Sequence, residues 1–172
     1  MTKGTKLVII ITALLAVIVA VFAWLNREYI SVRSEAQENE VFYIRADEMD
    51  FTVSMDDIAA LSPFDISANY KTTGQTAETR VYQGVSLRAV FDSLGIDYSG
   101  YSSVHFFAAD GYVSALTIKE AMDSGNCFIA IALNNKPLGT KESGGSGPFM
   151  MILPNDRFSQ RWCKFVLEIT LQ

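Results

Sequence analysis

Four basic side chains are the clearest candidates for ligand binding in an otherwise acidic sequence. Arg157, Arg161 and Lys164 stand close together near the C-terminus, and Arg80 is a fourth candidate. Guanidinium and ammonium groups are the side chains that bind phosphate and carboxylate groups in proteins. The pattern predicts an anion-binding site, and a solvated set of surface charges would produce the same spacing.

Two turn segments offer further candidate contacts. Asp110-Gly111-Tyr112 contains a dipeptide typical of tight hairpins, so it predicts a turn at least. The glycine-rich stretch at residues 143–147 (SGGSG) would expose backbone N–H groups, notably at Gly144 and Gly145, that could cradle an anion. It matches neither the Walker pattern nor a dinucleotide fingerprint, and a flexible surface loop is the alternative.

Catalytic side chains of the common classes are scarce. His105 is the single histidine, so a triad or an imidazole-rich metal site would need a partner chain. It stands between Val104 and Phe106, where a hydrogen-bonded structural histidine and a ligand contact both remain open. The sequence has no G-x-S-x-G motif, which removes support for a hydrolase of that class.

Of the two cysteines, Cys127 begins one expected strand and Cys163 directly precedes another. Outside the cytoplasm such a pair can form a disulfide if the backbone geometry permits. Two buried thiols that act as small apolar residues are the alternative.

The N-terminus contains a candidate membrane anchor. Residues 7–25 read LVIIITALLAVIVAVFAWL, nineteen residues without a charge. A helix of this length rises about 28 Å, close to the roughly 30 Å thickness of a hydrocarbon core. Lys3 and Lys6 precede it without an acidic residue, which favours a cytoplasmic N-terminus and an extracytoplasmic remainder. A cleaved signal peptide is the alternative, but the apolar run exceeds its usual length of roughly 7–15 residues.

The net charge of the sequence disfavours two classes of binding partner. Without Lys3 and Lys6, the sequence keeps 12 basic and 19 acidic residues, a net charge of −7. An acidic surface disfavours nucleic acid and anionic lipid headgroups, so neither is expected as a ligand. We therefore expect residues 1–6 in the cytoplasm, an anchor over 7–25, a linker over 26–40 and one domain over 41–172.

Strands and helices are mixed along that domain without regular alternation, which favours the α+β class. Alternating and β-branched patterns predict strands over residues 41–45, 50–54, 64–70, 78–82, 103–109, 112–116, 127–133, 148–154 and 164–171. Helices are expected over 55–61 and 86–94, the second with an apolar stripe and Gly95 as its terminating residue. Thr117 and Glu120 form a capping box that predicts a third helix ending at Gly125.

The order of these motifs resembles the molybdopterin-binding domain of the sulfite oxidase superfamily. The resemblance rests on Gly84-Val85-Ser86-Leu87 before a Leu-rich helix, Asp110-Gly111-Tyr112 in a hairpin, residues 130–138, residues 148–154 and Arg161-Trp162 before the last strand. It covers roughly residues 50–172 and is carried by order and spacing. It implies an α+β mixed-sheet fold, a cofactor that is molybdopterin or another pterin, and a pocket bordered by the hairpin.

The sequence departs from this family where its chemistry resides. The resemblance implies a cysteine thiolate on molybdenum before the Gly-Val helix, yet residues 68–82 contain no cysteine, and Cys127 and Cys163 do not match that position. The family's arginine after the Gly-Pro turn falls on Met150, and its lysine before tryptophan is Arg161.

We therefore expect a membrane-anchored, extracytoplasmic and non-catalytic domain that binds a pterin-like or other anionic ligand, or docks a redox partner in the membrane. An active molybdenum-dependent oxidoreductase and a structural subunit of a membrane redox complex are the alternatives. The resemblance and the residue chemistry together nominate no catalytic residue and no metal ligand, and they nominate these cofactor contacts: Arg80, His105, Asp110, Tyr112, Gly144, Gly145, Arg157 and Arg161.

Overall fold

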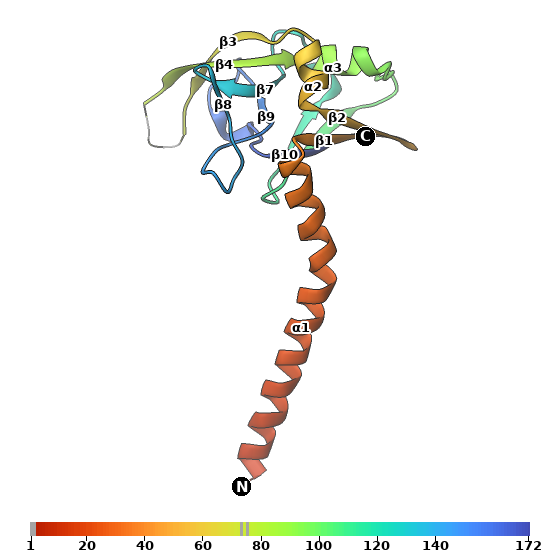
Figure 1. Cartoon of the computed structure of the whole chain (residues 1–172), viewed down its shortest axis with the longest axis vertical. Coiled ribbons are helices and arrows are strands. Elements are labelled where there is room, and N and C mark those ends of the chain that lie inside the picture. The colour runs from red at the N-terminus through yellow and green to blue at the C-terminus, as the bar shows by residue number, and fades with distance from the viewer. Residues whose placement is uncertain (1–2, 73, 75) are drawn as a thin grey trace. The chain divides into compact units, whose positions relative to one another are not determined.

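A computed structural model describes residues 3–72, 74 and 76–172 (Figure 1). The chain divides into two compact units, Met1–Glu35 and Ala36–Gln172. The first unit is a helix and the second is an α+β domain. Each is described by itself.

The first unit contains most of helix α1, which runs from Lys3 to Glu38. Its segment Gly4–Leu25 is long and apolar enough to cross a membrane. The apolar side chains of this segment are exposed, for example Trp24 and Phe22. The expected linker over residues 26–40 is helical as far as Glu38.

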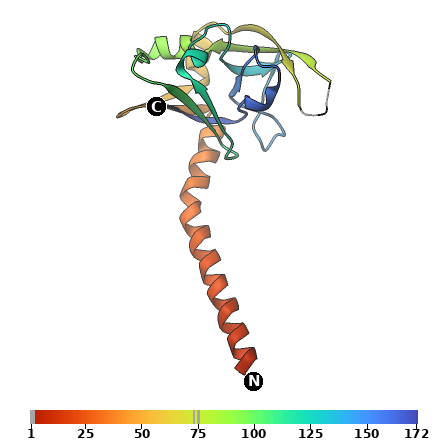
Figure 2. The same ribbon diagram turned by 180° about the vertical axis from the view of Figure 1, so that it is seen from behind.

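One sheet of the domain has five strands in the order β2-β1-β10-β5-β6. The two strands that come first and last along the domain, β1 and β10, pair in parallel, whereas the other neighbours are antiparallel. The β5–β6 hairpin is seen from the opposite side in Figure 2. The strands are β1 (Val41–Ala46), β2 (Met49–Ser54), β5 (Ser103–Ala108), β6 (Val113–Thr117) and β10 (Val166–Leu171).

The second sheet is antiparallel, with the order β3-β4-β7-β8 and with β9 also paired to β7. Its central strand β7 is the apolar run FIAIAL, buried on both faces over most of its length. The strands are β3 (Phe64–Tyr70), β4 (Glu78–Ser86), β7 (Phe128–Leu133), β8 (Lys136–Pro137) and β9 (Met150–Ile152).

Hydrogen bonds from capping residues fix where the helices of the domain begin. The side chain of Ser54 accepts the N–H of Asp57 at the start of α2 (Met55–Ala60), and Asp57 bonds back to the backbone of Ser54. Ser86 caps α3 (Leu87–Leu94), which ends at Gly95 with φ 66°. α4 (Ile118–Ala121) has its own capping box, and η1 (Ser159–Arg161) is a short 3-10 helix.

The core is formed by the inward residues of both sheets together with α3. Phe42 of β1 meets Phe149 edge-on with ring centroids 4.9 Å apart, and both are fully buried. Leu87, Val90 and Phe91 supply the buried stripe of α3. The predicted α+β class with a mixed sheet is confirmed.

Three elements differ from their predicted lengths by three residues or more, and one of them, the strand expected over residues 148–154, is limited to Met150–Ile152. The strand expected to end at Tyr82 continues to Ser86, because Gly84 lets β4 approach β7 so closely that a Cβ there would lie 2.2 Å from the carbonyl oxygen of Ile129. The helix expected to reach Gly125 stops at Ala121. Asp123 then accepts the N–H of Gly125 and forms a turn in its place.

Candidate functional site

Tyr70, at the end of β3, is the centre of a group of basic and aromatic side chains. The guanidinium carbon of Arg80 lies 3.9 Å from the centroid of the Tyr70 ring. The ammonium group of Lys164 lies 5.9 Å from the same centroid. Arg80 also forms an ion pair with Glu78 at 2.6 Å, so Lys164 is the less neutralised of the two cations.

A second aromatic ring with two cations adjoins the first. Lys71 follows Tyr70 directly, and its ammonium group lies 5.0 Å from the centroid of Phe158. The guanidinium carbon of Arg157 lies 5.4 Å from that centroid. Both the backbone N–H and the hydroxyl of Ser159 donate to the carbonyl of Lys71, at 3.0 and 2.9 Å. These two bonds hold the C-terminal loop against the end of β3.

The ring of Tyr70 packs against Trp162. The rings of Tyr70 and Tyr82 both contact its indole edge-on, with centroids 5.8 and 5.7 Å away. The indole N–H donates to the carbonyl of Leu153 at 3.1 Å, which fixes the ring in the core. Burial raises the pKa of Tyr82.

We call the surface group the cation–aromatic cluster: Tyr70, Lys71, Arg80, Arg157, Phe158 and Lys164. Of the predicted contacts, it brings together Arg80 and Arg157. Sequence reasoning missed Tyr70, Lys71 and Phe158. Tyr70-Lys71 and Arg157-Phe158 each place a cation beside an aromatic residue in the sequence, and this is the local signal of the cluster. The two pairs lie far apart in the sequence, so the sequence does not show that they meet in space.

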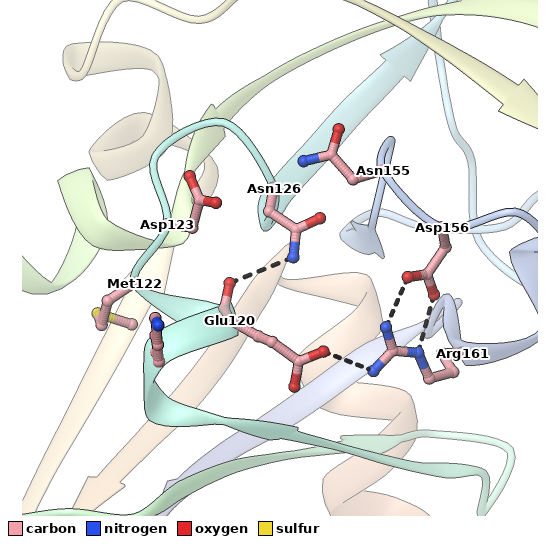
Figure 3. Close-up of a pocket in the computed structure, with 8 residues that line it drawn as sticks. Glu120, Met122, Asp123, Asn126, Asn155, Asp156 and Arg161 are labelled. Atoms are coloured by element: carbon pink, nitrogen blue, oxygen red, sulfur yellow. Dashed lines mark hydrogen bonds and ion pairs between the residues drawn. The ribbon is translucent and has the colours of Figure 1, made fainter.

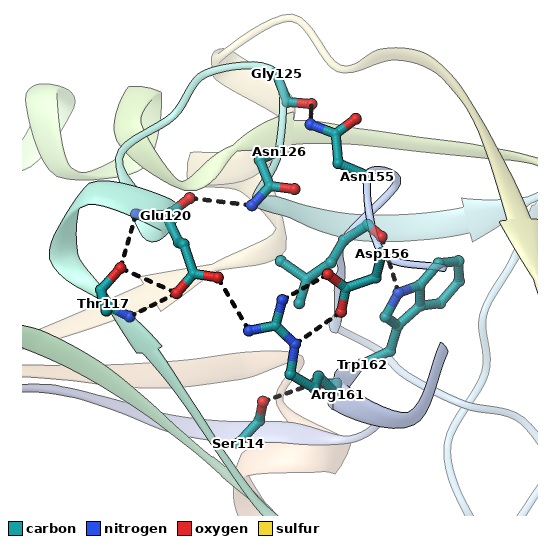
Figure 4. A network of polar contacts seen from close by, with 10 residues as sticks. Ser114, Thr117, Glu120, Gly125, Asn126, Asn155, Asp156, Arg161 and Trp162 are labelled. Carbon is teal, nitrogen blue, oxygen red and sulfur yellow. Dashed lines mark hydrogen bonds and ion pairs between the residues drawn. The ribbon is translucent and has the colours of Figure 1, made fainter. Parts of the chain in front are cut away.

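Arg161, the third predicted arginine, is not part of this cluster and pairs with two carboxylates (Figure 4). Its guanidinium donates to Asp156 through Nε at 2.8 Å and Nη2 at 2.5 Å, and to Glu120 through Nη1 at 3.1 Å. The hydrogen bond with Asp156 is the main cause that raises its pKa. Two carboxylates already pair with this guanidinium, and the contact of Arg161 with a cofactor stays a prediction.

The network around Arg161 is tied to strand β6. The N–H and hydroxyl of Thr117 both donate to Glu120, and these bonds are the main cause that lowers the pKa of the Glu120 carboxyl. The hydroxyl of Ser114 donates to the carbonyl of Arg161 at 2.7 Å. Arg161 therefore joins η1 to α4 and β6.

The predicted hairpin residues, Asp110 and Tyr112, form hydrogen bonds within the protein. Asp110 accepts the N–H of Tyr112 at 3.0 Å, as in an Asx turn. The Tyr112 hydroxyl donates to the carbonyl of Gln160 at 2.7 Å, and burial is the main cause that raises its pKa. The hairpin thus adjoins the loop that carries Arg161, but its polar groups already have partners.

His105 lies apart from these groups. Its strand alternates, with Val104 and Phe106 buried in the core and His105 half-buried on the other face. Its Nε2 lies 3.2 Å from the hydroxyl oxygen of Ser103. The contact matches the structural alternative for this histidine.

The glycine-rich loop does not expose the amides that the sequence suggested. The N–H groups of Gly144, Gly145, Ser146 and Gly147 donate to carbonyls at positions 141, 140, 138 and 139, respectively. A Cβ at Gly145 would lie 2.2 Å from the carbonyl oxygen of Leu138, so the loop is folded tightly on itself. The basis for an anion cradle at Gly144 and Gly145 is therefore corrected.

Both thiols are free and fully buried, as the second alternative for them proposed. Burial raises the pKa of the Cys127 thiol, and it raises that of Cys163 to about 12. Met150, at the position where the family has an arginine, is a core residue. Among the residues the structure describes, no three His, Cys, Asp or Glu side chains are grouped to hold a metal ion.

An open pocket of about 600 Å³ lies beside the Arg161 network (Figure 3). Helix α4 with the loop that leads to β7 forms one part of it, and the loop between β9 and η1 together with Arg161 of η1 forms the other. None of the predicted contacts except Arg161 lines it. Its lining residues are Lys119, Glu120, Met122, Asp123, Asn126, Asn155, Asp156 and Arg161.

Comparison with known proteins agrees with this architecture. The family model for the oxidoreductase molybdopterin binding domain matches residues 47–172. No curated protein sequence gives a significant match. Among solved structures, the sulfane dehydrogenase SoxCD from Paracoccus pantotrophus has the same fold, with a TM-score of 0.64 and 15% sequence identity.

That match covers 78% of this chain and 38% of the SoxCD chain, so it concerns one domain of a longer protein. At this identity it shows the fold alone. The family model is the stronger finding, because it spans nearly the whole domain that follows the apolar helix. The chain therefore belongs to the oxidoreductase molybdopterin binding domain family.

Proposed function

We propose that this chain is a membrane-anchored, extracytoplasmic and non-catalytic member of its family that binds a pterin-like or other anionic ligand. The cation–aromatic cluster is the binding surface. The observation that carries the proposal is four cations arranged about two aromatic rings, Tyr70 and Phe158, in a domain that is otherwise acidic.

The cluster suits a planar anionic ligand for two reasons. Its cations can pair with phosphate oxygens, and the guanidinium of Arg80 is already oriented by Glu78 and Tyr70. Its aromatic rings offer faces and edges on which a heterocycle can pack. Three of the cations, Lys71, Arg157 and Lys164, have no carboxylate within ion-pair distance among the described residues.

The residues present do not fit the metal half of the family's cofactor. A soft metal centre of this type needs a thiolate, and the chain has only Cys127 and Cys163. Both are buried in the core with raised thiol pKa values, so neither can reach a ligand at the surface. This mismatch supports binding without catalysis.

Anchoring rests on helix α1. Gly4–Leu25 is long enough to span a bilayer, Lys3 directly precedes it and Lys6 lies in its first turn. These charges favour a cytoplasmic N-terminus and an extracytoplasmic domain. Resistance to alkaline extraction, combined with protease access to the domain in intact cells, tests this arrangement. Cytoplasmic protection of the domain would contradict it.

The function is tested on protein extracted from its native membrane with the helix intact. Molybdenum is measured by elemental analysis, and pterin by fluorescence after oxidation. We expect pterin or another small anion without molybdenum. Stoichiometric molybdenum with turnover would instead establish an oxidoreductase. A domain without ligand that co-purifies with a redox protein would establish a subunit of a membrane complex.

A binding experiment localises the ligand. Neopterin monophosphate is titrated into the full chain in detergent, with neopterin as the uncharged comparison. We expect Arg80→Gln and Lys164→Gln each to weaken binding of the phosphate about ten-fold, because each removes a charge-assisted contact. Arg88→Gln is the matched control, since Arg88 lies on α3 and pairs with Asp92. Equal affinities for all three variants would contradict the assignment.

A further inference from the structure

The pocket beside Arg161 has the opposite chemical character to the cation–aromatic cluster. It shares no side chain with that cluster. Its charged lining consists of the carboxylates of Glu120, Asp123 and Asp156 and the cations Lys119 and Arg161, a net charge of −1. Arg161 is paired with two of the carboxylates. The carboxylate of Asp123 therefore remains as the acidic group without a cationic partner in the described part of the chain.

A buried polar atom points to a missing partner in this pocket. Asn126 is 7% exposed, and its Nδ2 donates to the carbonyl of Glu120 at 3.3 Å. Its Oδ1 is buried and has no hydrogen-bond partner among the described residues. Figure 3 shows this oxygen on the side of the residue that faces Asn155 and Asp156, and Asn126 is one of the residues that line the pocket.

If the positions of Oδ1 and Nδ2 in the Asn126 amide were exchanged, one buried atom would still have no hydrogen-bond partner. With Oδ1 placed toward the carbonyl of Glu120, two acceptors would face each other and Nδ2 would be the atom without a partner. A buried amide oxygen without a donor has a free-energy cost comparable to a lost hydrogen bond, so such atoms usually have a partner. A donor from outside the described protein atoms, a water molecule or a ligand group, would satisfy this oxygen.

Most donors around these acceptors are already used, and the ammonium group of Lys119 is the exception in the lining. Asn155 Nδ2 donates to the carbonyl of Gly125, and the guanidinium of Arg161 donates to Glu120 and Asp156. Asp123 uses one carboxylate oxygen to accept the N–H of Gly125. Its other oxygen, Asn126 Oδ1 and Asn155 Oδ1 are the acceptors without a hydrogen bond among the described residues. A ligand that satisfies the first two must donate hydrogen bonds, and the net charge favours a cation.

We propose that this pocket binds a small organic cation, a primary amine, whose ammonium group donates to Asn126 Oδ1 and to the carboxylate of Asp123. An ammonium group has three donors and no acceptor, which matches the unfilled acceptors of the pocket. The volume of about 600 Å³ lies within the range of small-molecule sites. The side chain of Met122 supplies an apolar wall for a short carbon chain.

The test is a calorimetric titration of the full chain in detergent with putrescine. 1,4-Butanediol is the matched uncharged probe, because it has the same carbon chain and hydroxyl donors in place of the ammonium groups. We expect putrescine to bind saturably, with one molecule per chain, and the diol to bind at least ten-fold more weakly. Absence of saturable putrescine binding would overturn the proposal.

Two variants assign the binding to this pocket. Asn126→Leu removes the unpartnered oxygen, and Asp123→Asn keeps the acceptor for Gly125 while it removes the charge. We expect each to weaken putrescine binding at least ten-fold, whereas Asp92→Asn on α3 leaves it unchanged. If Asn126→Leu does not fold, as judged by thermal unfolding, Asp123→Asn at the exposed rim carries the test. Equal putrescine affinity in the wild type and Asp123→Asn would overturn the proposal.

Discussion

Arg161 and Asp156 form a two-bond ion pair, with the guanidinium Nε 2.8 Å from one carboxylate oxygen and Nη2 2.5 Å from the other. The side chain of Asp156 is 14% exposed, so the pair is partly shielded from water. Glu120 accepts a third hydrogen bond from the same guanidinium. The arginine that the sequence nominates as a ligand contact is therefore a structural link between three segments.

Replacement of Arg161 by Gln should lower the free energy of unfolding by roughly 1–2 kcal/mol, because it leaves a nearly buried carboxylate without its partner. Chemical denaturation of the full chain in detergent, followed by circular dichroism, measures this. Arg88→Gln is the control, and its exposed pair with Asp92 should contribute less than about 0.5 kcal/mol. Equal losses in the two variants would contradict a special role for Arg161.

Acid should destabilise the domain in part through Glu120. Hydrogen bonds from Thr117 lower the pKa of Glu120 in the folded chain below its ordinary value of 4.5. A lowered folded pKa stabilises the fold at pH values above about 4.5, and this contribution is lost as the pH falls through the folded pKa. The unfolding midpoint of Glu120→Gln should therefore depend less on pH than that of the wild type between pH 5 and 3. Parallel profiles would contradict this assignment.

Gly84→Ala should destabilise the domain by roughly 1–3 kcal/mol, since the added methyl group would collide with the backbone of Ile129 and force β4 and β7 apart. Thermal or chemical unfolding measures the loss. Gly100→Ala is the matched control, because a Cβ there meets no atom within 4 Å. Its stability should remain within about 0.5 kcal/mol of the wild type. A tolerated alanine at position 84 would show that the strands can separate at little cost.

Neither cysteine should react in the folded chain. Burial raises the pKa of Cys163 to about 12 and also raises that of Cys127, so both thiols stay protonated at pH 8 and are shielded from reagents. We expect labelling by a disulfide reagent at pH 8 to be at least about a hundred-fold slower in the native chain than in guanidinium chloride. Rapid labelling of either native thiol would reopen the question of a metal ligand.

Local sequence determined the elements whose energetics depend on near neighbours. The Thr117–Glu120 capping box, the stop at Gly95 and the strand Phe64–Tyr70 all match their predictions. Caps, turns and apolar periodicity involve residues at most a few positions apart, so their signals are visible in the chain itself. The α+β class followed from the same patterns.

Only the tertiary structure decided which polar groups remain available to a ligand. Arg161 meets Glu120 across 41 positions, while the group around Tyr70 joins β3 to the C-terminal loop. The amides of the glycine-rich loop found carbonyl partners in the preceding segment, at positions 138–141. Whether a charge or an amide is already satisfied depends on its neighbours in space, and spacing along the chain does not encode that pairing.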